Sequence, residues 1–271
     1  MSENIAFIGG GNMASALISG LLHQGWQAGA IQVVEPFEGA RDSLQRRFGV
    51  PASTQAGPSL GQAALVVWAV KPQVFKVAAR AAGPHCTSAL HLSVAAGIRT
   101  DSMARWLGSQ RIIRAMPNTP ALIGQGVCGL FARAATSAGD KTLVERLIAS
   151  TGQFLWLDEE SQLDVVTALS GSGPAYVFYL MEALVQAGTS LGLSPDQAKR
   201  LVLGTCSGAS ALAAGSAETP QSLRQQVTSK GGTTHAAINI LEAEQWGTIV
   251  NRAVQAAHRR AVELGDEYGT D

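Results

Sequence analysis

Short apolar runs alternate with amphipathic stretches from the N-terminus to about residue 155. The runs are residues 5–8, 31–34, 65–70, 89–94, 111–116, 127–131 and 154–157. Several of them are apolar on both faces, as strands between two layers of helices are. An amphipathic stretch between consecutive strands is typical of a sheet whose strands run parallel and whose crossovers are helices. This part of the chain is therefore predicted to form an α/β domain.

From about residue 161 the strand pattern ends, and apolar positions follow a helical period. Helices are expected from Ala175 to about Leu191, from Ser194 to Gly215 and over residues 220–228, with two more before the C-terminus. Pro174 and Pro195 stand where the first turn of a helix accepts proline. The helix that ends at Leu191 has more apolar surface than a small domain can cover, so we expect subunit contacts there.

The first predicted strand leads into a G-x-G-x-x-A turn and then into a helix. Gly9 allows the tight turn, Gly11 removes the side chain that would block a pyrophosphate, and Ala14 lets the helix lie close to the strand. Asn12 and Met13 begin the helix, where free N–H groups favour an anion. We therefore predict a Rossmann-type dinucleotide-binding domain over residues 1–160, followed by an all-helical domain over residues 161–271.

Glu35 ends the second predicted strand, where a carboxylate accepts hydrogen bonds from the ribose of a dinucleotide. A carboxylate there repels a 2′-phosphate, which favours NADH over NADPH. Arg41, Arg46 and Arg47 follow, and a cation among them could accept the 2′-phosphate if Glu35 turned away. Both cofactors stay open, with Glu35 favouring NADH.

The ends of later strands carry further candidate cofactor contacts, because ligands bind outside the carboxyl ends of an open α/β sheet. Lys71 is held by the proline after it and is expected to line the nicotinamide half, with its ammonium on a ligand or at the surface. Asn118 lies between two prolines and has either a carboxamide contact or a structural role in its loop. The cofactor-binding candidates at these strand ends are Ala69, Lys71, Pro72, Ala95 and Asn118.

The composition narrows the class of protein. Apolar residues make up 46% and charged residues 15%, and 20 basic side chains balance 20 acidic ones. Without a basic face, nucleic acid is not an expected partner. No apolar stretch suits a membrane span, and the first strand follows the N-terminus at once, so a cytoplasmic protein is expected. Cys86, Cys128 and Cys206 are expected to be reduced and buried, and the scattered histidines predict no metal site.

Four segments, in order along essentially the whole chain, resemble the pyrroline-5-carboxylate reductases of proline biosynthesis. They are residues 7–14, 69–72, 114–120, and the pair 170–176 with 227–234. The resemblance implies the last step of that pathway, reduction of Δ1-pyrroline-5-carboxylate to L-proline by hydride transfer from NADH or NADPH. It also implies a homodimer or a ring of dimers, with the helical domain binding the substrate and dimerising.

The loop before a predicted helix is the candidate substrate site, because its N–H groups and hydroxyls suit a carboxylate. Its members are Ser229, Lys230, Gly231, Gly232, Thr233 and Thr234. The resemblance supports Thr234 as the hydroxyl near the ring nitrogen and the candidate catalytic residue. Two positions depart from the family pattern: Lys230 replaces a usual proline, and Ala56 stands where an asparagine is frequent. Lys230 is either a solvated charge or an additional attraction for the carboxylate.

Other functions remain as alternatives. A β-hydroxyacid dehydrogenase places a catalytic lysine on the helix after its interdomain glycine motif, but no lysine occurs here between Lys141 and Lys199. A reductase of another cyclic imine fits the same residues. A nucleotide-binding regulator without turnover would also keep this fold, and cofactor oxidation in the presence of the imine would separate it from an enzyme.

Overall fold

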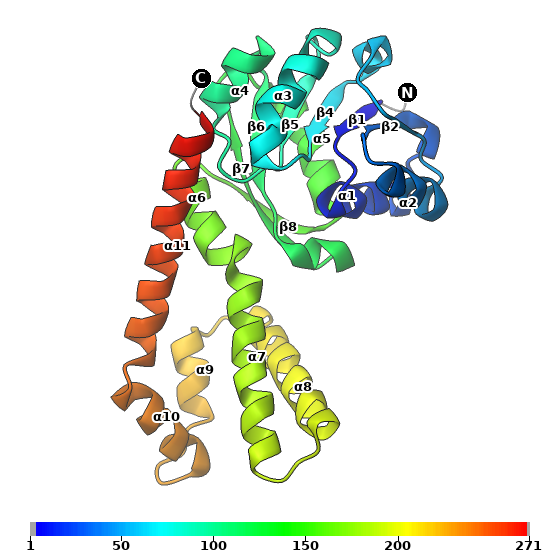
Figure 1. Ribbon diagram of the computed structural model, residues 1–271. Coiled ribbons are helices and arrows are strands. Elements are labelled where there is room, and N and C mark those ends of the chain that lie inside the picture. Colours follow the sequence, from blue (N-terminus) through cyan, green and yellow to red (C-terminus); the bar gives the residue numbers. More distant parts are fainter. Residues whose placement is uncertain (1–3, 270–271) are drawn as a thin grey trace. The chain divides into compact units, whose positions relative to one another are not determined.

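The computed structural model describes residues 4–269, and the chain divides into two compact units (Figure 1). The first unit runs to Ser172 and takes up the chain again from Ala256, and the second comprises Gly173–Gln255. The first, which we call the nucleotide unit, holds a sheet with its covering helices. The second, the helical unit, is built from helices alone. The chain thus completes the helical unit before it returns to the nucleotide unit at Ala256.

One sheet of eight strands forms the centre of the nucleotide unit, in the order β3-β2-β1-β4-β5-β6-β7-β8. Neighbouring strands are parallel except for β6 and β7, which pair antiparallel. The strand order reverses at β1, which has β2 on one side and β4 on the other. The crevice outside their carboxyl ends is the expected ligand site. The strands are β1 (Ile5–Ile8), β2 (Ile31–Val34), β3 (Ala52–Ser53), β4 (Leu65–Trp68), β5 (Leu90–Ser93), β6 (Ile112–Met116), β7 (Gly126–Ala132) and β8 (Gly152–Trp156).

The antiparallel pair β6–β7 is the feature of the sheet that differs from the all-parallel expectation. Residues 117–125 connect these strands through a short 3₁₀ turn, Thr119–Ile123. A parallel return would need a crossover of a dozen or more residues, so this connection is too short for one. The two-residue strand β3 was also not predicted, because so short a run has no readable period.

Helices cover both faces of the sheet and bury two apolar cores. On one face Leu17, Leu44 and Leu147 come from three different helices, and on the other face Phe75 and Met103 come from two more. The first three helices are α1 (Asn12–His23), α2 (Glu38–Phe48) and α5 (Ala138–Ala149), and the other two are α3 (Pro72–Ala82) and α4 (Thr100–Leu107). Burial on both faces explains the apolar strands and confirms the predicted α/β class.

The nucleotide unit continues past residue 160, where the domain boundary was expected. α6 (Gln162–Val166) and a π-helical turn (Thr167–Gly171) belong to it, and Leu163 is fully buried there. Arg114 on β6 is only 2% exposed, and its guanidinium pairs with Glu160 at 3.1 Å and Asp164 at 3.6 Å. This buried ion pair holds the start of the segment on the sheet, so the break between the units falls after Ser172.

The helical unit consists of α7 (Gly173–Ser190), α8 (Pro195–Ala214), α9 (Pro220–Gln226), α10 (Thr233–Ala243) and the start of α11 (Trp246–Gly269). Ser194 caps α8 and forms a capping box with Gln197, as the sequence suggests for this helix start. At Gly188 a Cβ atom would lie 3.1 Å from the Ala198 Cβ, so the absence of a side chain lets α7 and α8 approach closely.

Large apolar side chains are exposed on this unit. Tyr179 is 75% exposed, and Phe178, Leu212 and Ile240 are also well exposed. Despite this apolar surface, none of the helices within residues 4–269 is long and apolar enough to cross a membrane. Of the three cysteines, Cys86 and Cys128 are buried, but Cys206 is only half-buried, which corrects the expectation for that residue. It lies on α8, whose side chains are mostly exposed.

The end of α11 belongs to the nucleotide unit and lies against α3, α4 and the loop after β5. Arg99 pairs with Asp266 at 2.8 Å, and Gln73 donates a hydrogen bond to the Tyr268 hydroxyl at 2.7 Å. A Cβ atom at Gly97 would lie 3.3 Å from Leu264, where the glycine also has a positive φ of 73°. The last turns of the chain thus hold a strand-end loop of the nucleotide unit.

Candidate active site

The turn between β1 and α1 has the geometry that the glycine motif predicts. Gly9 has a φ of 97°, and a Cβ atom there would lie 2.6 Å from the Ala69 carbonyl oxygen. Any other residue would therefore be strained and would push β1 away from β4. Gly11 differs, since no heavy atom lies within 4 Å of its Cβ position. The space in front of Gly11 is open to a ligand.

The N-terminus of α1 is suited to an anion. Gly11 is its N-cap, no side chain caps the helix, and the first turn holds no acidic residue. The N–H groups of Asn12 and Met13 thus have no capping partner, and the positive end of the helix dipole is uncompensated. The pyrophosphate of a dinucleotide fits this arrangement, because it would satisfy these donors.

Glu35 follows β2 and is 7% exposed. Its two carboxylate oxygens accept backbone hydrogen bonds from Gly10 at 2.8 Å and from Phe37 at 2.9 Å. The carboxylate therefore ties the glycine turn to the start of α2. The sequence suggested only a contact with ribose for this side chain, and the bond to Gly10 is an additional role.

The strand ends beside the glycine turn bring the other cofactor candidates to one edge of the sheet, since β2, β1, β4, β5 and β6 are neighbours. Ala69 borders Gly9, and Lys71 is the exposed N-cap of α3 with Pro72 in its first turn. Ala95 after β5 is buried, and its N–H group donates to the Ser93 hydroxyl at 3.2 Å. Apart from Lys71, these two strand ends present backbone and small side chains at this edge.

Asn118 follows β6, and its carboxamide is already used within the protein. Its oxygen accepts a hydrogen bond from the Val127 N–H group at 3.0 Å, and its nitrogen donates to the Ser170 carbonyl at 3.2 Å. The side chain thus connects the loop to β7 and to the π-helical turn. Of the two roles considered for Asn118, the structural one is visible in these bonds.

The candidate substrate loop lies in the helical unit, before α10. Gly231 has a φ of 76°, and the Gly232 N–H group donates to the Ser229 carbonyl at 3.1 Å, which closes the turn. Gly232 is the N-cap of α10, with no side-chain cap and no acidic residue in the first turn. Within residues 4–269, the hydroxyls of Thr233 and Thr234 have no hydrogen-bond partner. Lys230 is exposed.

Three buried side chains of the nucleotide unit, one histidine and two cysteines, are poor acids or nucleophiles. Burial, together with the positive charge of Arg111, lowers the pKa of His91 to about 4. Burial raises the pKa of Cys86 to about 11 and that of Cys128 to about 12. These side chains are neutral near pH 7, so they contribute packing rather than charge. Within the described residues, no group of three or more His, Cys, Asp or Glu side chains could hold a metal ion.

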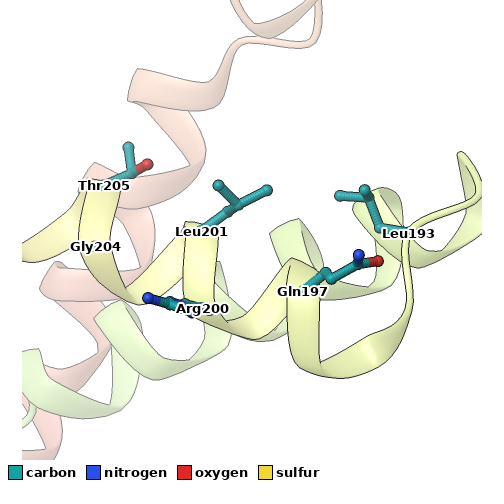
Figure 2. A pocket seen from close by; sticks show the side chains of 6 residues that line it. All are labelled: Leu193, Gln197, Arg200, Leu201, Gly204 and Thr205. Carbon is teal, nitrogen blue, oxygen red and sulfur yellow. The ribbon is translucent and has the colours of Figure 1, made fainter.

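A hollow of about 560 Å³ lies along α8 and the loop before it (Figure 2), and none of the residues that line it is a candidate site residue. Its lining combines apolar, polar and cationic side chains with a glycine. The lining residues are Leu193, Gln197, Arg200, Leu201, Gly204 and Thr205. It therefore belongs to the surface of the helical unit and not to the candidate active site.

Two family models match parts of the chain. Residues 160–264 match "Pyrroline-5-carboxylate reductase dimerisation", and residues 4–97 match "NADP oxidoreductase coenzyme F420-dependent". The first match covers the helical unit and the hollow on α8, and the second covers the glycine turn and the ends of β2 and β4.

Similar proteins match over nearly their full length. A pyrroline-5-carboxylate reductase of Pseudomonas aeruginosa is 43% identical, with 99% of each chain covered, and one of Pisum sativum is 36% identical over 97% of this chain and 96% of that one. Among solved structures, the reductase of Coxiella burnetii has a TM-score of 0.90 and 37% identity, covering 97% of this chain and 99% of that one. The Plasmodium falciparum enzyme with NADP bound has a TM-score of 0.87 and 28% identity, with 97% and 98% covered.

Proposed function

The chain belongs to the pyrroline-5-carboxylate reductases, the NAD(P)H-dependent oxidoreductases of the last step of proline biosynthesis, and on this premise we propose which of its residues carry the reaction. The nucleotide unit binds the cofactor at the carboxyl edge of its sheet, and loop 229–234 binds the substrate. The observation that carries the proposal is the uncapped N-terminus of α1 behind Gly9 and Gly11. The free N–H groups of this helix start have no partner from the protein, and the pyrophosphate of a dinucleotide would accept their hydrogen bonds.

We propose that the pyrophosphate lies against Gly11, Asn12 and Met13, whose backbone groups bind it. Ala69 borders the glycine turn, Lys71 and Pro72 follow it at the start of α3, and Ala95 lies after the neighbouring strand. The small side chains of Ala69 and Ala95 leave room for the nicotinamide ring. Asn118 shapes this edge through its hydrogen bonds to Val127 and Ser170.

Loop 229–234 is proposed to hold the substrate carboxylate. The N–H groups at the start of α10 can donate to the carboxylate. The unpaired hydroxyls of Thr233 and Thr234 can donate to it as well, or accept a hydrogen bond from the protonated ring nitrogen. Lys230 adds a positive charge beside the loop, which attracts a carboxylate at long range. We assign Thr234 the position nearest to the ring nitrogen.

A protonated cyclic imine is already electron-poor at the carbon that receives the hydride. When bound, the nicotinamide cofactor supplies that hydride. The protein therefore has mainly to bind and orient the two rings, and a strong protein acid is not required. The hydroxyls of loop 229–234 suit this task, because a hydroxyl oxygen that accepts a hydrogen bond from the ring N–H orients the imine without removing its proton.

The choice between NADH and NADPH is proposed to depend on Glu35. Each oxygen of its carboxylate accepts one backbone hydrogen bond and has capacity for a ribose hydroxyl. The negative charge disfavours a 2′-phosphate, which favours NADH.

We predict that Glu35→Ser raises kcat/KM for NADPH relative to NADH. Both values should fall, because the glycine turn loses the hydrogen bond from Gly10 to the carboxylate. Glu35→Gln is the matched variant, since it removes the charge and keeps the length; an unchanged cofactor ratio in both variants would contradict the role.

We also propose a homodimer formed through the helical unit, either by itself or assembled into a ring of dimers. The exposed apolar side chains of α7 and α8 support this, because a monomer would leave them in water. The match of residues 160–264 to a dimerisation family supports the same surface.

The direct test is the oxidation of each nicotinamide cofactor by the purified protein with Δ1-pyrroline-5-carboxylate, followed at the absorbance of the reduced nicotinamide. Turnover that depends on the imine is expected, and proline should form in equal amount. The six-membered homologue of the substrate serves as the comparison, and a higher kcat/KM for it would point to a different imine. Cofactor binding without turnover on either imine would indicate a regulator instead.

A further inference from the structure

An exposed aromatic side chain stands beside the proposed ribose site. Phe37 comes two residues after Glu35 and is 74% exposed. Its backbone is fixed, because its N–H group donates to the Glu35 carboxylate at 2.9 Å and it forms the N-cap of α2. The ring itself belongs to neither apolar core of the nucleotide unit. A fixed backbone with an exposed ring is the arrangement of a stacking platform.

A half-buried cation, Arg41, is bonded to the backbone just before Phe37. Nη1 of Arg41 donates to the carbonyl oxygens of Glu35 at 3.0 Å and of Pro36 at 2.6 Å. Its Nη2 and Nε groups have no partner within residues 4–269, and the guanidinium makes no ion pair there. The side chain is therefore held in place by one nitrogen and offers the other two to a ligand.

We propose that Phe37 stacks on the adenine of the bound cofactor and that Arg41 binds the 2′-phosphate when that cofactor is NADPH. This inference rests on the proposed function, since it concerns the cofactor of that reaction. The adenosine of a dinucleotide lies beyond the carboxyl end of β2, which is where both side chains begin. Adenine offers an aromatic face to Phe37, and the 2′-phosphate offers paired oxygens to the guanidinium.

The hydrogen bonds of Glu35 allow one site to accept either NADH or NADPH. Its carboxylate accepts N–H groups from Gly10 and Phe37, and its carbonyl oxygen accepts from Arg41. Both oxygens of the carboxylate are thus hydrogen-bonded, and the Arg41 guanidinium is bonded to the backbone carbonyl of the same residue. Repulsion of a 2′-phosphate is reduced where that cation can approach it. Glu35 then disfavours NADPH only in part, and Arg41 offsets the remainder.

The two residues are separated by binding experiments on cofactor fragments, which need no turnover. Isothermal titration calorimetry with AMP and with adenosine 2′,5′-bisphosphate compares ligands that differ by the 2′-phosphate. Fluorescence titration with NADH and NADPH gives the same comparison for the whole cofactor. Phe37→Ala should weaken all four ligands about tenfold, because adenine is common to them. Arg41→Met should weaken only the two 2′-phosphorylated ligands, by about tenfold or more.

Matched controls come from the same unit. Val77→Ala removes an apolar side chain that is 71% exposed on α3, and Arg80→Ala removes an exposed cation from the same helix. Both should bind all four ligands as the wild type does. Phe37→Trp keeps a stacking surface and should retain affinity, which separates stacking from a change in the fold. Thermal unfolding of each variant checks that the nucleotide unit is intact.

The outcomes distinguish this inference from the proposed function. If the wild type oxidises cofactor with the imine but Phe37→Ala binds AMP within twofold of the wild type, stacking is wrong and the reductase function stands. If Arg41→Met weakens AMP as much as the bisphosphate, Arg41 does not bind the 2′-phosphate. If the wild type binds neither fragment nor either whole cofactor, the nucleotide site itself is misassigned and both proposals fail.

Discussion

Thr234 allows substrate handling to be separated from cofactor binding, because it lies in the helical unit and the glycine turn lies in the nucleotide unit. Thr234→Ala removes one hydroxyl that has no partner within the described chain. A hydrogen bond to a charged group contributes about 1.5–3 kcal/mol, so kcat/KM for the imine should fall roughly ten- to a hundredfold. The Kd for NADPH, measured by fluorescence, should stay the same.

Thr142→Ala is the control for this change, because the Thr142 hydroxyl on α5 donates only to the Ala138 carbonyl of its own helix. It should leave both kcat/KM and Kd as they are. Thr234→Ser keeps the hydroxyl and should restore most of the activity. A Thr234→Ala enzyme with unchanged kcat/KM would remove Thr234 from the site.

Single residues also show how far sequence reasoning extends. The roles of Gly9 and Gly11 in the turn could be read from their spacing, because a strand precedes them and a helix follows. The hydrogen bonds of Asn118 could not be predicted from the sequence, because their partners Val127 and Ser170 come close to Asn118 only in the folded protein. The exposure of Phe37 could not be predicted either. No feature of the sequence shows whether an aromatic ring just before a helix is buried or exposed.

At the scale of elements, substitutions at the two positions of the glycine turn should have different effects, one on stability and the other on cofactor binding. Gly9→Ala forces an alanine to a φ of 97° and brings its Cβ atom against the Ala69 carbonyl. We expect a loss of at least about 2 kcal/mol in the free energy of unfolding, seen as a lower Tm. Gly11→Ala meets no protein atom within 4 Å. It should keep the Tm but raise the Kd for NADPH about tenfold or more, because its Cβ atom occupies the place of the pyrophosphate.

Gly29→Ala is a suitable control for the glycine turn, since Gly29 is exposed and no heavy atom lies within 4 Å of its Cβ position. Thermal unfolding with and without NADPH measures both effects in one experiment. Equal loss of Tm in the Gly9 and Gly11 variants would show that the open space in front of Gly11 has been misread.

The N-terminus of α5 predicts a pH dependence. Asp140 accepts hydrogen bonds from Ser137 in a capping box and pairs with Arg111 at 2.7 Å. Burial alone would raise the pKa of Asp140, but these hydrogen bonds outweigh it and hold the pKa below its ordinary value. A lowered pKa in the folded state adds stability above the unfolded value of about 3.9, and this stability is lost as pH falls through the folded value.

We therefore expect Asp140→Asn to lower the Tm at pH 7 by about 2–4 °C, the change that about 1 kcal/mol produces in a chain of this size. The difference from the wild type should shrink as the pH falls below about 4, because the unfolded state binds the proton first, and it is lost below the lowered pKa of Asp140 in the folded protein. Asp42→Asn, which changes an exposed carboxylate on α2, should show neither effect. A difference that stays constant from pH 7 to pH 3 would assign the effect to packing and not to charge.

The order and type of the elements followed from periodicity, except for the two-residue strand β3 and two further features. Both the antiparallel pair β6–β7 and the position of α6 depend on tertiary contacts. A strand pattern is the same for either direction, so only the short connection 117–125 gives the direction of β7. α6 stays with the sheet because Arg114, Glu160 and Asp164 pair within it, and the sequence does not show which charges meet.

At the scale of the whole molecule, composition and pattern predicted two parts of different character, and the chain does form a sheet-containing unit and a helical one. The return of residues 256–269 to the nucleotide unit could not be predicted. A helical period continues unbroken from Trp246 to Gly269, and nothing along it marks where one unit ends. The contacts of Asp266 and Tyr268 with Arg99 and Gln73 decide it.

The apolar surface of the helical unit leads to the last prediction. Tyr179 on α7 is 75% exposed, in a segment that matches a dimerisation family. Sedimentation velocity at micromolar concentration should show a dimer or larger and no monomer. Tyr179→Glu places a charge on this surface and should shift the protein toward the monomer, since an unpaired buried charge costs several kcal/mol at an interface.

Val77→Glu is the control, because it places the same charge at a side chain that is 71% exposed in the nucleotide unit. This variant should stay assembled. A wild-type monomer with full activity would contradict dimerisation through the helical unit. Dissociation of both variants alike would show instead that the interface extends to α3.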